Sequence, residues 1–146
     1  MSMELLRHGE LKRRQLQHGA AAIGITEEFI THVVADFYTR IRRHPVLGRI
    51  FDAQVGDNWD EHLATMRRFW CSVALNTGTY SGKPVIVHTA LPQISPAHFD
   101  IWLGIFEQTL DARAPTTAAK EHMMIRAQRI ARNLQLAIAT RDGQQG

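Results

Sequence analysis

Four side chains able to do chemistry lie among apolar residues of this sequence. Tyr38, His62 and Trp102 fall on or beside the apolar rows of three predicted helices. His88 lies instead in the short apolar stretch GKPVIVHTALP (residues 82–92), which has a proline near each end. A neutral imidazole can bind a metal ion, whereas phenol O–H and indole N–H groups donate hydrogen bonds. The four side chains could therefore bind a metal-containing group together with a small polar ligand.

Aromatic residues crowd around this set. They are Phe51, Trp59, Phe69, Trp70, Tyr80, Phe99, Trp102 and Phe106. A single inward tyrosine, tryptophan or histidine is commonly an ordinary core residue whose polar atom bonds a carbonyl group. A large flat cofactor, however, needs apolar walls and one axial nitrogen, and haem iron takes a neutral imidazole in such a setting. The combination therefore indicates a haem pocket, in which Tyr38, His62 and Trp102 could hydrogen-bond a diatomic ligand.

The elements that must position these side chains are helices. A first helix is predicted from Thr26, a good N-cap followed by two glutamates, to an apolar corner at residues 46–51. A second covers about residues 58–75, a third begins after Ser95 with proline at its first position, and a last one begins at Pro115. No stretch alternates at period two for long. The predicted fold class is all-α, with four longer helices around one core.

Length and composition favour one ordinary globular domain. The chain has 146 residues, 45% of them hydrophobic, and no apolar run approaches the roughly 20 residues that span a bilayer. The N-terminal residues contain no apolar block of signal-peptide length, so a cytoplasmic location is expected. Cys71 is the single cysteine, which excludes an intrachain disulfide and a cysteine-based metal cluster. The net charge of +3, with scattered arginine pairs, is not that of a dedicated nucleic-acid binder.

Four stretches of the chain resemble the third group of truncated haemoglobins, a family of small bacterial haem proteins. They are FYTRIRRHPVLGRIF (37–51), WDEHLATMRRFW (59–70), GTYSGKPVIVHTALP (78–92) and HFDIWLGIFEQTL (98–110). Their order and spacing match the family over nearly the whole chain. The resemblance implies a two-over-two helical sandwich, a shortened globin, as one truncated globin domain over residues 26–140. Residues 1–25 would be an N-terminal extension with a flexible GAAAIG stretch, and residues 141–146 a frayed tail.

The resemblance also implies a role for each candidate side chain. His88 would be the proximal ligand of the haem iron, with Tyr38, His62 and Trp102 on the distal side, where the diatomic ligand binds. Phe51 would wedge against the haem ring at the corner between two helices. Further residues that would line the cofactor are Phe69, Trp70, Tyr80 and Phe106. The candidates for contact with the haem propionates, by position alone, are Arg67, Tyr80 and Lys83.

The expected cofactor is haem b, and the expected ligands are oxygen, nitric oxide and carbon monoxide. Three hydrogen-bond donors in a dry pocket would hold a partly negative oxygen ligand tightly, which suits reaction better than storage. We therefore expect redox or detoxification chemistry, resembling that of a nitric oxide dioxygenase or a peroxidase, with a reductase as partner if the protein turns over. No carboxylate is placed beside His88, which disfavours a dedicated peroxidase. A haem-based oxygen carrier or sensor is the alternative.

Two further hypotheses belong to other classes of protein. A helical bundle that binds nucleic acid through its basic pairs would bind in a salt-sensitive way and hold no chromophore. A non-haem metal enzyme would use His62, His88 and a carboxylate such as Asp60 or Glu61, and it would contain iron or zinc without porphyrin. The haem hypothesis does not require the two histidines to come within reach of one metal ion, because they can lie on opposite faces of the cofactor.

Overall fold

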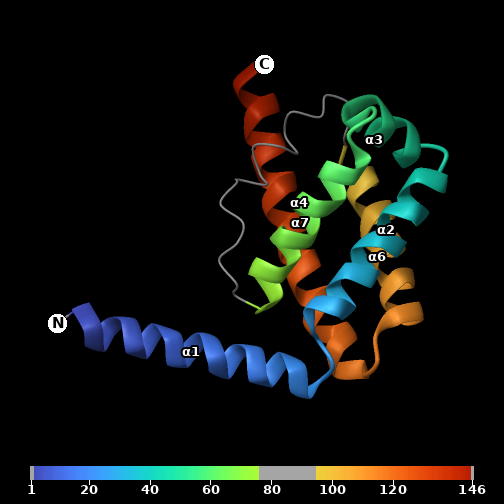
Figure 1. The fold of residues 1–146 in the computed structure, drawn as a ribbon. Coiled ribbons are helices and arrows are strands. Elements are labelled where there is room, and N and C mark those ends of the chain that lie inside the picture. The colour runs from blue at the N-terminus through green and yellow to red at the C-terminus, as the bar shows by residue number, and fades with distance from the viewer. Residues whose placement is uncertain (1, 76–94, 146) are drawn as a thin grey trace.

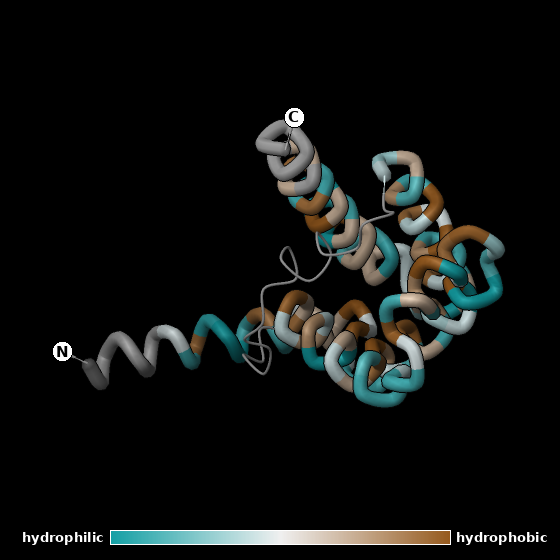
Figure 2. Tube along the Cα trace, turned by 90° about the horizontal axis from the view of Figure 1, so that it is seen from above, coloured by the Kyte–Doolittle hydropathy of each residue, from teal (hydrophilic) through white to brown (hydrophobic). Residues whose placement is uncertain are grey.

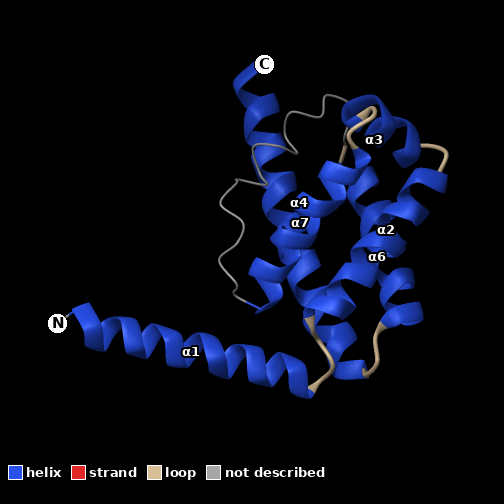
Figure 3. Cartoon of the chain, in the orientation of Figure 1, coloured by secondary structure: helices blue, strands red, loops and turns tan. Residues whose placement is uncertain are grey.

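The structure, a computed structural model, describes residues 2–75 and 95–145, and every regular element in those ranges is a helix (Figure 1, Figure 3). The elements are α1 (Ser2–Ala22), α2 (Glu27–Arg43), α3 (Leu47–Val55), α4 (Trp59–Leu75), α6 (Pro96–Arg113) and α7 (Thr117–Gln145). The all-α fold class predicted from the sequence is confirmed. No helix of the described ranges is both long and apolar enough to cross a membrane.

The helices stack in two layers, as a two-over-two globin requires. α2 and α4 pack against each other in one layer, and α6 and α7 form the other (Figure 1). α2 lies on α6 and α4 on α7, so the core forms where the layers meet. In Figure 2 hydrophobic and hydrophilic residues alternate along the helices, the pattern of helices with one buried face. The fully buried core residues include Ile30, Ile41, Phe106, Leu110, Met123 and Ala127.

Two predicted helix starts agree with the structure. The Thr26 hydroxyl accepts a hydrogen bond from the Phe29 amide at 3.1 Å, at the start of α2. α6 begins at Pro96, and the Ser95 amide donates to His98 Nδ1 at 3.0 Å. Side chains at a helix start supply partners for backbone groups that the helix itself leaves without one. The local sequence therefore determines where these two helices begin.

The predicted apolar corner is itself a helix, α3. His44 Nδ1 accepts hydrogen bonds from the amides of Val46 and Leu47, both at 3.2 Å, at the start of this helix. The absence of a side chain at Gly48 allows α3 to pack closely against the last turn of α2. A Cβ atom at this position would lie 2.5 Å from the backbone carbonyl oxygen of Arg42. Nine residues are too few to show a helical period in the sequence. α3 places the Phe51 side chain in the core.

Residues 2–22, expected to belong to an extension, form the helix α1, which projects away from the two layers (Figure 1). Gln17 Nε2 donates a hydrogen bond to the Leu75 carbonyl oxygen at 3.0 Å, and this joins α1 to the end of α4. Leu11 and Leu16 are 57% and 54% exposed. Because residues 9–22 of α1 bury no continuous apolar stripe, the sequence shows no helical period there.

The C-terminal helix α7 continues to Gln145. The frayed tail over residues 141–146 stays a prediction. The limits of the globin domain, residues 26 and 140, stay a prediction.

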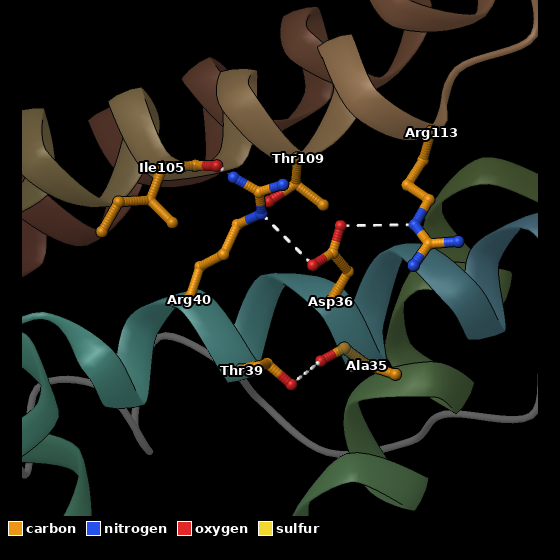
Figure 4. Close-up of polar contacts among 7 residues, drawn as sticks. All are labelled: Ala35, Asp36, Thr39, Arg40, Ile105, Thr109 and Arg113. Atoms are coloured by element: carbon orange, nitrogen blue, oxygen red, sulfur yellow. Dashed lines mark hydrogen bonds and ion pairs between the residues drawn. The ribbon is translucent and has the colours of Figure 1, made fainter.

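Asp36 links α2 to α6 across the two layers (Figure 4). Its carboxylate accepts hydrogen bonds from Arg40 Nε at 3.2 Å and from Arg113 Nε at 3.3 Å. The Asp36 side chain is 17% exposed, so this ion pair is partly shielded from water. Because Arg113 belongs to the last turn of α6, the contact fixes how α6 lies along α2. These two helices carry Trp102 and Tyr38 respectively.

Candidate functional site

Tyr38 and His62, two of the candidate residues, lie in direct contact. Tyr38 comes from the buried face of α2 and is 2% exposed. His62 comes from α4, and the two ring centroids are 5.1 Å apart, with their planes at 88°. Edge-to-face packing of this kind is a favoured arrangement of aromatic rings. The packing of α2 on α4 therefore brings a phenol and an imidazole to one place.

Burial keeps the phenol of Tyr38 in its neutral form. Removal from water raises the pKa of Tyr38 well above its ordinary value, because the phenolate would lose its hydration. The rings of Phe51 and Trp59 pack around it, with centroids 6.0 Å and 5.9 Å from its own. A neutral phenol carries one O–H that it can donate. Tyr38 is therefore a hydrogen-bond donor throughout the physiological pH range.

Trp102, the third candidate donor, joins this pair through Phe37. Phe37 packs edge to face on Tyr38, with centroids 5.1 Å apart, and on Trp102 at 5.5 Å. Trp102 is partly exposed on α6, and its ring stacks on Phe106 at 5.8 Å with an interplanar angle of 3°. The three polar side chains predicted to act together thus belong to one packed group of rings.

The candidate wall residues extend the same group. Phe106 stacks on Trp70 at 5.0 Å, and Trp70 packs on Phe69 at 5.4 Å. All three side chains are buried. Together the rings form the aromatic cluster, which comprises Phe37, Tyr38, Phe51, Trp59, His62, Phe69, Trp70, Trp102 and Phe106. The aromatic cluster draws on α2, α3, α4 and α6, so it forms only when both layers are assembled.

A polar triangle that the sequence does not predict lies beside Tyr38 and His62. Asp52 Oδ1 accepts a hydrogen bond from Trp59 Nε1 at 3.1 Å and lies 3.3 Å from Arg42 Nε. The Arg42 guanidinium lies over the Trp59 ring, 4.5 Å from its centroid. Trp59 packs in turn on His62, with centroids 5.6 Å apart. The three residues come from three helices, so only the aromatic character of Trp59 gave any signal in the sequence.

Several candidates fall outside the described residues. These include His88, the predicted iron ligand, as well as Tyr80 and Lys83. Arg67, another candidate for contact with a propionate, lies exposed on α4. The roles of these side chains therefore stay predictions.

The described residues contain no cluster that would hold a bare metal ion. No three of their histidine, cysteine, aspartate or glutamate side chains come together in a suitable way. Asp60 and Glu61, the carboxylates of the non-haem hypothesis, are exposed on α4. Cys71 is buried. Desolvation raises the pKa of its thiol, and the negative charge of Glu27 raises it further. A buried thiol of this kind is chemically inert, which agrees with a structural role.

The chemistry of the described side chains fits the distal half of a haem site. A haem ring needs flat apolar walls, and the aromatic cluster offers them from two layers of helices. A small polar ligand needs hydrogen-bond donors. Tyr38 offers a neutral O–H, and the rings of His62 and Trp102 carry N–H groups. Donors and walls are therefore both available within one packed group.

Comparison with known proteins points to one family. Residues 21–136 match the family model described as bacterial-like globin. The group 3 truncated haemoglobin ctb of Campylobacter jejuni is 34% identical over 114 residues, which cover 76% of this chain and 89% of that protein. The crystal structure of a group III truncated haemoglobin from Campylobacter jejuni matches with a TM-score of 0.74 and 33% identity, over 78% of this chain and 91% of that one. The sequence comparison and the structural comparison therefore point to the same kind of protein, and each covers most of the chain.

Proposed function

This chain belongs to the bacterial-like globins, as a group 3 truncated haemoglobin, and on that premise we propose that it carries out redox or detoxification chemistry on a diatomic ligand. As a globin it binds haem and a diatomic ligand. The proposal adds that the cofactor is haem b, that His88 would bind its iron, and that the ligands are oxygen, nitric oxide and carbon monoxide. Haem, when bound, supplies the iron that coordinates the diatomic ligand.

The observation that carries the proposal is the contact between Tyr38 and His62 in a largely buried site. A polarised diatomic ligand carries partial negative charge, and hydrogen bonds to charged acceptors are roughly twice as strong as neutral ones. The low dielectric of a buried site strengthens them further. With Trp102 as a third donor, these side chains would hold such a ligand tightly.

Tight retention suits conversion of the ligand better than its delivery. The neutral O–H of Tyr38 can hold the ligand without giving up its proton, because burial disfavours the phenolate. A neutral imidazole has one N–H donor and one acceptor nitrogen, so His62 is the group suited to passing a proton. These properties support reaction of oxygen with nitric oxide, or activation of peroxide. Repeated turnover needs electrons, so a reductase is the expected partner.

The aromatic cluster would keep water away from this chemistry. Its buried members Phe51, Phe69, Trp70 and Phe106 offer flat apolar surface, and Tyr80 is assigned to the same wall from the resemblance. Exclusion of water strengthens each hydrogen bond to the ligand and limits proton leakage. The proposal includes a cytoplasmic location and no nucleic-acid partner, which cell fractionation and a DNA-retention assay would test.

The experiment that tests the proposed function combines two measurements on the reduced protein saturated with oxygen. The first is the rate of oxygen release, measured by stopped-flow mixing with carbon monoxide. The second is the rate of haem oxidation on mixing with nitric oxide, with nitrate as the product. We expect slow release and rapid oxidation. Fast release with slow oxidation would instead favour an oxygen carrier or sensor.

A further inference from the structure

The polar triangle of Arg42, Asp52 and Trp59 is closed, because each of its side chains contacts the other two. Asp52 Oδ1 accepts a hydrogen bond from Trp59 Nε1 at 3.1 Å and forms an ion pair with Arg42 Nε at 3.3 Å. The Arg42 guanidinium covers the indole ring at 4.5 Å. Turning the indole by half a revolution would move Nε1 away from the carboxylate. The triangle therefore selects one orientation of the Trp59 ring.

Trp59 connects this triangle with the buried donors. Its side chain is 8% exposed, whereas the side chains of Arg42 and Asp52 are 49% and 51% exposed. The Trp59 ring packs on Tyr38 at 5.9 Å and on His62 at 5.6 Å, the latter with planes at 89°. The indole thus lies between a surface ion pair and the two donors of the proposed ligand site.

Stability alone does not account for the triangle. An ion pair between half-exposed side chains contributes little to the free energy of folding, because water screens it. The triangle instead fixes the orientation of the Trp59 ring. Edge-to-face packing depends on the angle between two rings, so a turned indole would no longer support the His62 ring in its present position.

We propose that Trp59, held by Asp52 and Arg42, is a positioning residue that sets the orientation of His62 beside Tyr38 and so controls retention of the diatomic ligand. This inference rests on the proposed function, since it concerns the same site. Trp59 touches the two donors, so its effect would pass through the His62 ring. Loss of the Asp52 acceptor would leave the indole free to turn and would broaden the range of His62 positions.

The test uses the haem-loaded protein and its carbon monoxide complex. Infrared spectroscopy of the C–O stretching band reports the hydrogen-bonding environment of the ligand. Asp52→Ala should split or broaden this band and speed oxygen release about fivefold, the size expected for weakening one hydrogen bond. Asp52→Asn keeps an acceptor oxygen and should retain the wild-type band. Asp57→Ala, which removes an exposed carboxylate from the turn between α3 and α4, is the matched control and should change nothing.

A double-mutant cycle tests whether Asp52 acts through Trp59. Trp59→Phe keeps an aromatic ring but removes the N–H, and it should change the band as Asp52→Ala does. The double variant should show no more than the single effect, because both changes break the same link. Additive effects, or an unchanged band in haem-loaded Asp52→Ala, would overturn the inference.

A second readout does not depend on haem. In the haem-free protein, the Trp59 indole N–H should exchange with solvent faster in Asp52→Ala than in the wild type, as followed by NMR. Equal exchange rates would overturn the inference by themselves. Failure of the wild-type protein to take up haem would instead overturn the proposed function, so the two failures are distinguishable.

Discussion

The rings of Tyr38 and His62 meet edge to face, with centroids 5.1 Å apart, although they come from different helices. Tyr38 is almost fully buried, and burial keeps its phenol protonated. The relationship places a neutral phenol O–H beside an imidazole ring, which carries both an N–H donor and an acceptor nitrogen when neutral.

Replacing Tyr38 by phenylalanine removes the hydroxyl but keeps the ring. We expect oxygen release from the reduced protein to become about 10- to 100-fold faster, the effect of losing one hydrogen bond to a charged acceptor. Stopped-flow spectroscopy measures this rate directly. Thr39→Ala is the matched control, because Thr39 carries an exposed hydroxyl that donates to the Ala35 carbonyl on the same helix (Figure 4). An unchanged rate in Tyr38→Phe would exclude the phenol as a ligand donor.

Tyr38 should also make stability depend on alkaline pH. Its pKa in the folded protein is raised above the ordinary value of 10.0, so the unfolded chain loses this proton first. The contribution to stability is fully present below the unfolded pKa and is lost as pH rises towards the folded one. Above about pH 10, the free energy of unfolding should fall more steeply in the wild type than in Tyr38→Phe, by about 1 kcal/mol per pH unit. Urea denaturation at several pH values measures both slopes, and parallel slopes would contradict the burial of the phenol.

Asp36→Asn should weaken the contact between the two layers. The expected loss of unfolding free energy is about 1 kcal/mol, kept small because Arg40 and Arg113 are 36% and 47% exposed to screening water. Salt should reduce the difference between variant and wild type, since the interaction is largely electrostatic. Glu121→Gln, an exposed carboxylate on α7, is the control. A loss that did not respond to salt would show that packing and not charge is responsible.

Gly48→Ala should destabilise the protein, because the new Cβ would lie 2.5 Å from a backbone oxygen at the end of α2. Overpacking of this kind costs about 1–3 kcal/mol of unfolding free energy. Gly104→Ala on α6 meets nothing within 4 Å and should instead stabilise by about 0.5–1 kcal/mol through helix propensity. Thermal or chemical denaturation of the two variants should therefore give shifts of opposite sign. Equal shifts would mean that α3 does not close on α2 as described.

Much of the fold could be predicted where the local sequence carries its own signal. Thr26 at the start of α2 and Ser95 before α6 mark helix starts by their chemistry, and the apolar rows of α2 and α4 have a visible period. The sequence does not indicate α1 or α3, because residues 9–22 of α1 bury no continuous apolar stripe and α3 is only nine residues long. The sequence carries a signal for a helix where the helix has a cap or a periodic apolar face.

The residues of the candidate site likewise fall into those that the sequence indicates and those that it does not. Tyr38, His62 and Trp102 could be selected because they interrupt apolar rows, and the resemblance to a family gave them roles. The contact between Arg42 and Asp52 could not be selected, because two charged residues on the surface of different helices leave no pattern in the sequence. Such contacts depend on how helices close on one another, which only the assembled fold specifies.

The most direct test of the central claim is an absorption spectrum of the haem-reconstituted protein, oxidised, reduced and with carbon monoxide, beside His88→Ala. His32→Ala, which removes an exposed histidine on α2, is the control. We expect a sharp Soret band that shifts with carbon monoxide, in the wild type and the control, and loss of the histidine-ligated form in His88→Ala. If the wild type takes up no haem, or if His88→Ala keeps the wild-type spectrum, the assignment of His88 as the iron ligand is contradicted.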